Sequence, residues 1–229
     1  MKIPFAALPE AITNAVLGLA YPPRCQACGR SMALFSGGVL CGDCYNGIKT
    51  DPGGFLINTD IFHFDASRSV CVYEGAIREC IHKFKYGNRA ASGRLFKKLM
   101  AEFAEKYMDM RRFDWLVPVP LHRDKEKERT FNQSGLLAIW LSQSSGVPVL
   151  NKNLVRVRPG RPQIASSKNK RISDIKGAFK VSRPRSMLGK TILLVDDVLT
   201  TGATANECSN VIKKAGADCV EVLTLARSV

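Results

Sequence analysis

Two adjacent carboxylates, followed by three threonines and a glycine, stand out in the stretch ILLVDDVLTTGATANE at residues 192–207. The acids are Asp196 and Asp197, and they follow directly on a run of apolar residues. Adjacent carboxylates repel each other, and this repulsion is costly unless a nearby cation or hydrogen bonds from hydroxyl groups offset it. A glycine turn that leads into a helix offers free N–H groups and the positive end of the helix to an anion. The stretch therefore predicts a site that holds hydroxyl groups at its acids and a phosphate at its turn, as a sugar phosphate requires.

A second group of residues with clear chemistry is formed by two C-x-x-C pairs, CQAC and CGDC, which are separated by residues 29–40. Two such pairs at this spacing are typical of a four-thiolate zinc site. The four ligands would be Cys25, Cys28, Cys41 and Cys44. Disulfide bonds are the alternative, which a cytosolic location disfavours. Because four protein ligands leave no coordination position open, we expect a structural zinc ion rather than a catalytic one.

The acid pair must be positioned by strands and helices, which alternate along the chain after a predicted linker at residues 50–60. Apolar runs predict strands at residues 69–73, 114–120, 190–197 and 219–227, with shorter candidates in LVRV and GAFKV. Helical periodicity predicts helices at residues 75–87, 93–108, 132–146 and from about 204 to 215. Strands that alternate with helices form a parallel sheet with both faces covered, and ligands bind at the carboxyl ends of its strands. We therefore expect an α/β fold with the acids at that edge of the sheet.

The chain is expected to have two domains, a zinc module at residues 1–50 and the α/β domain at residues 51–229. A short amphipathic helix would follow Pro9. Polar residues and prolines interrupt the apolar N-terminal segment, and no stretch approaches the ~20 apolar residues that a membrane span requires. We therefore expect a cytosolic protein rather than a secreted one.

The charge of the chain is strongly basic, with 34 Lys and Arg against 20 Asp and Glu and a net charge of +14. Such an excess predicts a polyanionic partner, which would be nucleic acid, a phosphorylated metabolite or both. A basic chain that is merely soluble is the alternative.

One segment of the sequence resembles part of the phosphate-binding motif of ATPases, but two features exclude this class of protein. LGKT at residues 188–191 resembles the end of a P-loop. Pro184, however, stands where that motif needs its first glycine, and Lys190 and Thr191 lead into a strand rather than a helix.

Two segments rich in cations are expected near the acids. The first follows a strand exit stiffened by Pro118 and Pro120, and as a cluster it favours a diphosphate-binding role, although a solvated loop is the better explanation for any single lysine in it. Its candidate residues are Leu121, His122, Arg123 and Arg129. The second, residues 156–179, is punctuated by proline and glycine and predicts a mobile loop. Its candidates for substrate contact are Gln163, Lys170 and Arg171, each of which could equally belong to an ordinary surface loop.

The stretch LLVDDVLTTGAT resembles the signature of type I phosphoribosyltransferases, which bind 5-phosphoribosyl-1-pyrophosphate (PRPP). The resemblance implies that Asp196 and Asp197 contact the ribose 2′ and 3′ hydroxyls. The 5′-phosphate would be bound by Thr200, Thr201, Gly202, Ala203 and Thr204. It further implies that Mg²⁺ is bound with PRPP and that a flexible loop closes over the ligand, so that Lys170 and Arg171 are candidate catalytic residues beside the two acids.

A longer resemblance, to the ComF family, runs from Cys25 to the last strand. It is carried by the four-Cys module, PVPLHRDKEKERTFNQSGLLA, VRVRPGRPQ with KRISDIKGAF, and DDVLTTGAT. These bacterial proteins are phosphoribosyltransferase-like and are linked to DNA uptake during natural transformation. The family's motif residues correspond here to Arg129, Phe131, Asn132, Gln133, Gln163 and Arg171. Phe131 could equally be a core residue, and Asn132 could cap the following helix.

The segment FKYGNRAASGRL at residues 84–95 also resembles a stretch common in that family. Lys83, Lys85 and Arg89 would then line a nucleic-acid path or the rim of the active site. Phe84 and Tyr86 between them could stack single-stranded bases. Cations attracted to the end of a helix are the simpler alternative.

Two functions remain open from the sequence. The first is an enzyme that binds Mg²⁺–PRPP and transfers phosphoribose to an unidentified acceptor, with release of pyrophosphate. The second is a non-catalytic protein that keeps the PRPP fold as a ligand-sensing scaffold and binds single-stranded DNA or a DNA-uptake helicase. Both require that the loop after the acids is accessible and that a structural lysine does not hold the two carboxylates.

Overall fold

The computed structural model describes residues 23–33, 39–50, 61–86, 89–122, 131–158 and 175–228, with the backbone alone described at residues 89–91. The helices are α2 (Gly42–Asn46), α3 (Gly75–Tyr86), α4 (Arg89–Tyr107), α6 (Gln133–Ser145) and α8 (Ala203–Lys214), with short 3-10 helices η2 (Met110–Arg112) and η3 (Pro184–Ser186). The strands are β1 (Ala66–Val72), β2 (Trp115–Pro118), β3 (Leu154–Arg156), β4 (Phe179–Val181), β5 (Thr191–Leu199) and β6 (Cys219–Arg227). The predicted helix after Pro9 and residues 51–60 of the predicted linker lie outside the described residues.

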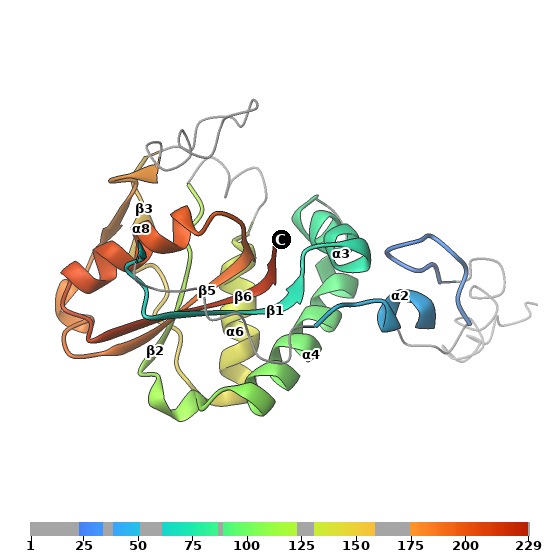
Figure 1. Ribbon diagram of the computed structural model, residues 1–229, viewed down its shortest axis with the longest axis horizontal. Coiled ribbons are helices and arrows are strands. Elements are labelled where there is room, and N and C mark those ends of the chain that lie inside the picture. Colours follow the sequence, from blue (N-terminus) through green and yellow to red (C-terminus); the bar gives the residue numbers. More distant parts are fainter. Residues whose placement is uncertain are drawn as a thin grey trace, which may run out of the picture.

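The main sheet contains four strands in the order β1-β6-β5-β2, and every neighbouring pair is parallel (Figure 1). The two central strands, β5 and β6, are the longest described strands of the sheet and carry its most continuous apolar runs. Such runs are expected where a parallel strand is buried on both faces. The predicted parallel sheet flanked by helices is confirmed.

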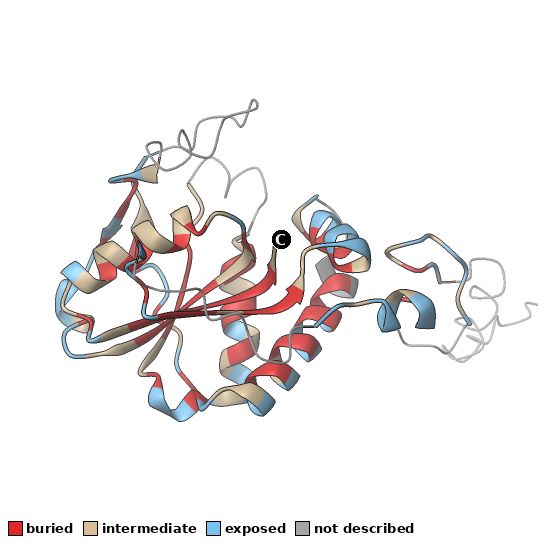
Figure 2. Cartoon of the chain, viewed as in Figure 1, coloured by how far each residue is buried: buried red, intermediate tan, exposed pale blue. Residues whose placement is uncertain are grey.

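Helices cover both faces of this sheet, and its strands are the most deeply buried part of the molecule (Figure 2). Side chains along β5 alternate between the two faces, as the geometry of a strand requires. Leu193 and Val195 belong to the apolar cluster that includes residues of α3, α4 and α6, whereas Ile192 and Leu194 belong to the cluster that includes residues of α8. The strand that carries the acids is therefore fixed between two cores.

The end of β5 differs from the sequence prediction, which placed it at the acids. β2 pairs with β5 only as far as Pro118 opposite Val195, so both acids project past the end of β2. On the other side, however, β5 continues to pair with β6 as far as Leu199 opposite Arg227. The acids therefore lie at the carboxyl edge of the sheet next to β2 but are still held by backbone pairing to β6.

The two short predicted strands form a separate unit. β3 and β4 pair antiparallel with each other and are not part of the main sheet. The alternation of strands and helices therefore predicted their existence but not their pairing, which is the kind that needs no helical crossover.

The four-Cys module packs against α3. Cys25, Val39 and Leu40 are buried in the same apolar cluster as Ile77 and Cys80 of α3. The Lys83 Nζ also donates a hydrogen bond of 2.6 Å to the Gln26 carbonyl inside the first C-x-x-C pair. Within the described part of the chain, no helix has the length and apolarity needed to cross a membrane.

Candidate functional site

The two adjacent acids have different partners in the structure. Asp196 Oδ1 accepts hydrogen bonds of 2.8 Å from the Ser134 hydroxyl in the first turn of α6 and of 2.8 Å from the backbone N–H of Asp197. Asp197 Oδ2 lies 2.6 Å from the Lys85 Nζ at the end of α3. The acids are thus joined to two separate helices.

Asp196 is the more strongly perturbed of the two carboxyl groups. Burial, together with the charge of Asp197, raises the pKa of Asp196 from 3.8 to about 7. The hydrogen bond from Ser134, the N–H of Asp197 and the charge of Lys85 act in the opposite direction. A carboxyl group that titrates near neutral pH is characteristic of functional sites, although structural networks also produce such shifts.

The loop after the acids leads directly into α8. Gly202 has φ +75° and occupies the position before the first helical residue, Ala203, whose N–H donates a long hydrogen bond of 3.4 Å to the Thr201 hydroxyl. A Cβ at Gly202 would lie 3.0 Å from the Phe62 ring, so that the position is restricted by both conformation and space. The N–H groups of the first helical turn have no partners within the helix, and an anion can satisfy them.

The loop is accessible from solvent. Thr200 is exposed, and Thr201, Ala203 and Thr204 are partly exposed, whereas Gly202 is buried beneath them. One of the two conditions stated for the sugar-phosphate interpretation is therefore met. The second is met only in part, because Lys85 engages one oxygen of Asp197.

The carboxyl end of β2 forms a cavity of about 800 Å³ with the turn before β3 and with β3 itself. Leu121 and His122 line it, which places the described part of the predicted diphosphate segment at the same edge of the sheet as the acids. Lys152 and Arg156 also line it. The cavity thus combines polar and cationic groups.

Asn132 connects this cavity to the acids. It lines the cavity, and it precedes Ser134, the hydrogen-bond partner of Asp196, by two residues. Its side chain does not cap α6, which was one alternative from the sequence, but donates a hydrogen bond of 3.0 Å to the Val119 carbonyl. Asn132 therefore holds the start of α6 against the end of β2.

Several predicted site residues cannot be placed in this arrangement. Arg123, Arg129, Gln163, Lys170 and Arg171 lie outside the described residues. Their roles remain predictions.

Lys85 is the residue whose position the sequence specified least. The motif around it suggested a place at the rim of the site or on a nucleic-acid path, and the structure brings its ammonium group to Asp197. Lys83, two residues earlier, contacts the four-Cys module instead. No spacing rule could have indicated this difference, because it depends on how α3 packs.

The four cysteines predicted to bind zinc are clustered. Their Sγ atoms all lie within 4.8 Å of one another, and those of Cys28 and Cys41 are 3.8 Å apart. A tetrahedral ion with Zn–S bonds of about 2.3 Å separates its sulfur ligands by about 3.8 Å. Gly29, at φ +73°, forms the tight turn after the first pair, and Arg30 pairs with Asp43 across the two halves. The cluster could bind a metal such as zinc.

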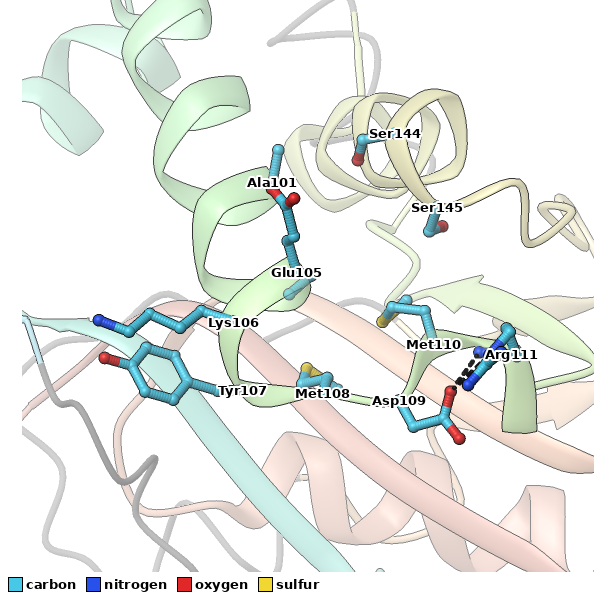
Figure 3. A pocket seen from close by; sticks show the side chains of 11 residues that line it. Ala101, Glu105, Lys106, Tyr107, Met108, Asp109, Met110, Arg111, Ser144 and Ser145 are labelled. Carbon is cyan, nitrogen blue, oxygen red and sulfur yellow. Dashed lines mark hydrogen bonds and ion pairs between the residues drawn. The ribbon is translucent and has the colours of Figure 1, made fainter.

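A cavity of about 990 Å³ lies elsewhere, at the ends of α4 and α6 and beside η2 (Figure 3). η2 is followed closely by the start of β2, so this cavity lies near the amino edge of the sheet. The Ser144 and Ser145 hydroxyls at its rim bond to carbonyls of their own helix, and Asp109 pairs with Arg111. Because these polar groups already have partners in their own helix or turn, we assign the chemistry to the acid pair and not to this cavity.

Comparison with known proteins is consistent with this choice of site. Residues 146–228, which contain β5, α8 and β6, match the family model described as a phosphoribosyl transferase domain. The chain is 28% identical over 210 residues to competence protein F of Haemophilus influenzae, covering 90% of this chain and 85% of that protein. It is 29% identical over 206 residues to competence protein ComFC of Bacillus subtilis, covering 89% and 78%. The resemblance to the ComF family is confirmed.

Further relatives extend the ComF resemblance over the whole length of a known protein. The DNA utilization protein YhgH of Escherichia coli is 28% identical over 230 residues, which cover 92% of this chain and all of that protein. A solved glutamine PRPP amidotransferase from Bacillus subtilis overlaps at a TM-score of 0.40, with 21% identity over 58% of this chain and 26% of that chain. The chain itself has a parallel sheet flanked by helices, a segment that matches the phosphoribosyl transferase domain, and an N-terminal four-Cys cluster.

Proposed function

We propose that this chain is a PRPP-binding, phosphoribosyltransferase-like protein of the ComF type that serves DNA uptake in a bacterial cytoplasm. The observation that carries the proposal is that the acid pair, the accessible loop of threonines and the start of α8 follow one another directly. All three lie in the segment matched by the family model. The names of the relatives, which refer to competence and DNA utilization, support the cellular role.

In this proposal the acids bind the sugar and the loop binds its phosphate. Asp196 and Asp197 accept hydrogen bonds from the ribose hydroxyls. The 5′-phosphate lies on the N–H groups and hydroxyls of the loop formed by Thr200, Thr201, Gly202, Ala203 and Thr204. Carboxylate and phosphate oxygens are the ligands that Mg²⁺ prefers, so the ion would enter with the diphosphate and neutralise its charge.

The diphosphate is assigned to the other side of the acids. Leu121 and His122 line the 800 Å³ cavity, and Arg123 and Arg129 follow them in sequence. Lys170 and Arg171 would act from the loop that covers the ligand and excludes water from it. In this assignment residues 1–50 form the metal-binding domain and residues 51–229 the ligand-binding domain.

Titration calorimetry tests the binding of Mg²⁺–PRPP. The wild-type protein is expected to bind, and Asp197→Asn is expected to bind at least about tenfold more weakly because one acceptor for the ribose hydroxyls loses its charge. Asp218→Asn, which removes the same charge from an exposed side chain before β6, is the matched control and should bind like the wild type. Absence of heat with the wild type at millimolar ligand would refute the proposal.

A second function, binding of single-stranded DNA or a helicase without catalysis, is favoured by the net charge of +14. It is also favoured by an exposed ring pair on α3, where His82 and Tyr86 lie 5.1 Å apart beside basic residues. Salt-sensitive DNA binding that survives Asp196→Asn and Asp197→Asn supports this function. PRPP-dependent release of pyrophosphate that the same substitutions abolish supports the enzyme.

A further inference from the structure

Lys85 forms an ion pair with Asp197, the second of the two acids. Its Nζ lies 2.6 Å from Asp197 Oδ2, and the two side chains are only 21% and 16% exposed. A pair so largely removed from water interacts more strongly than a surface pair and is costly to break on one side only. Lys85 lies outside residues 146–228, the segment that the family model matches.

The end of α3 is held in place from two directions. Phe84, the residue before Lys85, is buried and makes edge contacts with the rings of Phe96 at 5.2 Å and Phe131 at 5.5 Å. On the other side of the helix, Lys83 bonds to the Gln26 carbonyl. The direction of Lys85 is therefore set by the fold and does not depend on a ligand.

The contact leaves part of Asp197 available. A carboxylate has about four positions that accept hydrogen bonds, and an ammonium group at Oδ2 uses one of them. The ion pair is made by Asp197 Oδ2, so the Oδ1 atom of the same carboxylate is not part of it. A hydroxyl group can therefore share the carboxylate with Lys85 and need not displace it.

The charge of Lys85 also matters for the ligand. A phosphorylated sugar with a diphosphate is a polyanion, and it must approach two adjacent carboxylates. Removal of Lys85 would leave those carboxylates facing the anion without a compensating charge, and like charges brought together in this way oppose binding.

We propose that Lys85 is a positioning residue of the phosphoribosyl site, which orients Asp197 toward a ribose hydroxyl and offsets the charge of the acids when the polyanion binds. This inference rests on the proposed function. It gives the end of α3 a defined role beside β5 and the start of α8.

Titration calorimetry with Mg²⁺–PRPP tests the inference on the full chain. Lys85→Met should weaken binding by at least about tenfold, and Lys85→Arg should restore it to within about threefold of the wild type. Arg78→Met removes the same charge from an exposed position of the same helix and should bind like the wild type. In an Asp197→Asn background, Lys85→Met should cost less than about threefold, because its partner is already neutral. If Lys85→Met does not fold, Lys85→Gln replaces it.

The outcomes separate the inference from the proposed function. Equal or tighter binding by Lys85→Met, an equal loss in Arg78→Met, or a full loss in the Asp197→Asn background would each overturn the role of Lys85 while PRPP binding stands. No binding by the wild type would overturn both.

Discussion

Asp196 gives the most quantitative prediction, because its pKa is raised by burial and by Asp197 to about 7 in the folded protein. The unfolded chain releases the same proton near the ordinary value of 3.8. The folded state therefore binds the proton more tightly than the unfolded state. Stability from this group is fully present below pH 3.8 and is lost as the pH rises through about 7.

The magnitude follows from the size of the shift. A shift of one pKa unit corresponds to about 1.4 kcal/mol. The shift of the Asp196 pKa therefore lowers the free energy of unfolding by about 4 kcal/mol between low and high pH. Between pH 5.5 and pH 8 the same relation gives a fall of about 2 kcal/mol in the free energy of unfolding. Because Asp196 is partly exposed, screening by water reduces the expected fall to about 1–2 kcal/mol.

Asp196→Asn should remove this fall, because the amide does not titrate. Urea unfolding followed by circular dichroism at several pH values from 5.5 to 8 measures the free energy of unfolding. The variant should be more stable than the wild type at pH 8, and this difference should narrow by about 1–2 kcal/mol toward pH 5.5. Asp218→Asn, which changes an exposed side chain, should keep the slope of the wild type. Two results would contradict the account of Asp196 as a desolvated acid. One is that the free energy of unfolding of Asp196→Asn falls with pH as steeply as that of the wild type. The other is that this variant is less stable than the wild type at pH 8.

Three further predictions concern the loop, the neighbouring helix and the cysteines. Gly202→Ala should lower the free energy of unfolding by about 1–2 kcal/mol, because the new Cβ must adopt positive φ beside Phe62; unchanged urea unfolding would contradict this. Ser134→Ala removes a hydrogen bond that favours the charged form of Asp196 and thus raises the pKa of Asp196, so the loss of stability with rising pH should be centred at a higher pH than in the wild type. Elemental analysis should find about one zinc ion per chain in the wild type and substantially less in Cys28→Ser. Cys219→Ser, which changes a cysteine outside the cluster, should keep the metal content of the wild type. Full metal content in Cys28→Ser would argue against a four-thiolate site.

Much of the fold followed from the sequence because local patterns determine it. The strand predicted at residues 219–227 coincides with β6, and the helix predicted to end at Gly146 does so, with φ +76° at that glycine. Continuous apolar runs indicated which strands lie at the centre of a parallel sheet.

The pairing of elements was less predictable. The apolar run of β5 ends at the acids, but hydrogen bonds to β6 extend the strand to Leu199, and sequence periodicity does not report such pairing. The antiparallel pairing of β3 with β4 was missed for the same reason. The acids, the loop and the four cysteines could be found in the sequence because each is a short contiguous motif. Lys85 could be suspected but not assigned, since its contact with Asp197 depends on how α3 packs against the sheet.

The most direct test of the central claim is a crystal structure of the full chain soaked with Mg²⁺–PRPP. We expect the 5′-phosphate on the N–H groups of residues 201–204 and the ribose hydroxyls within hydrogen-bond distance of Asp197, with Lys85 still in contact with that carboxylate. A sugar phosphate bound only at another surface, such as the cavity between the ends of α4 and α6, would contradict the claim that the acid pair and the start of α8 form one phosphoribosyl site.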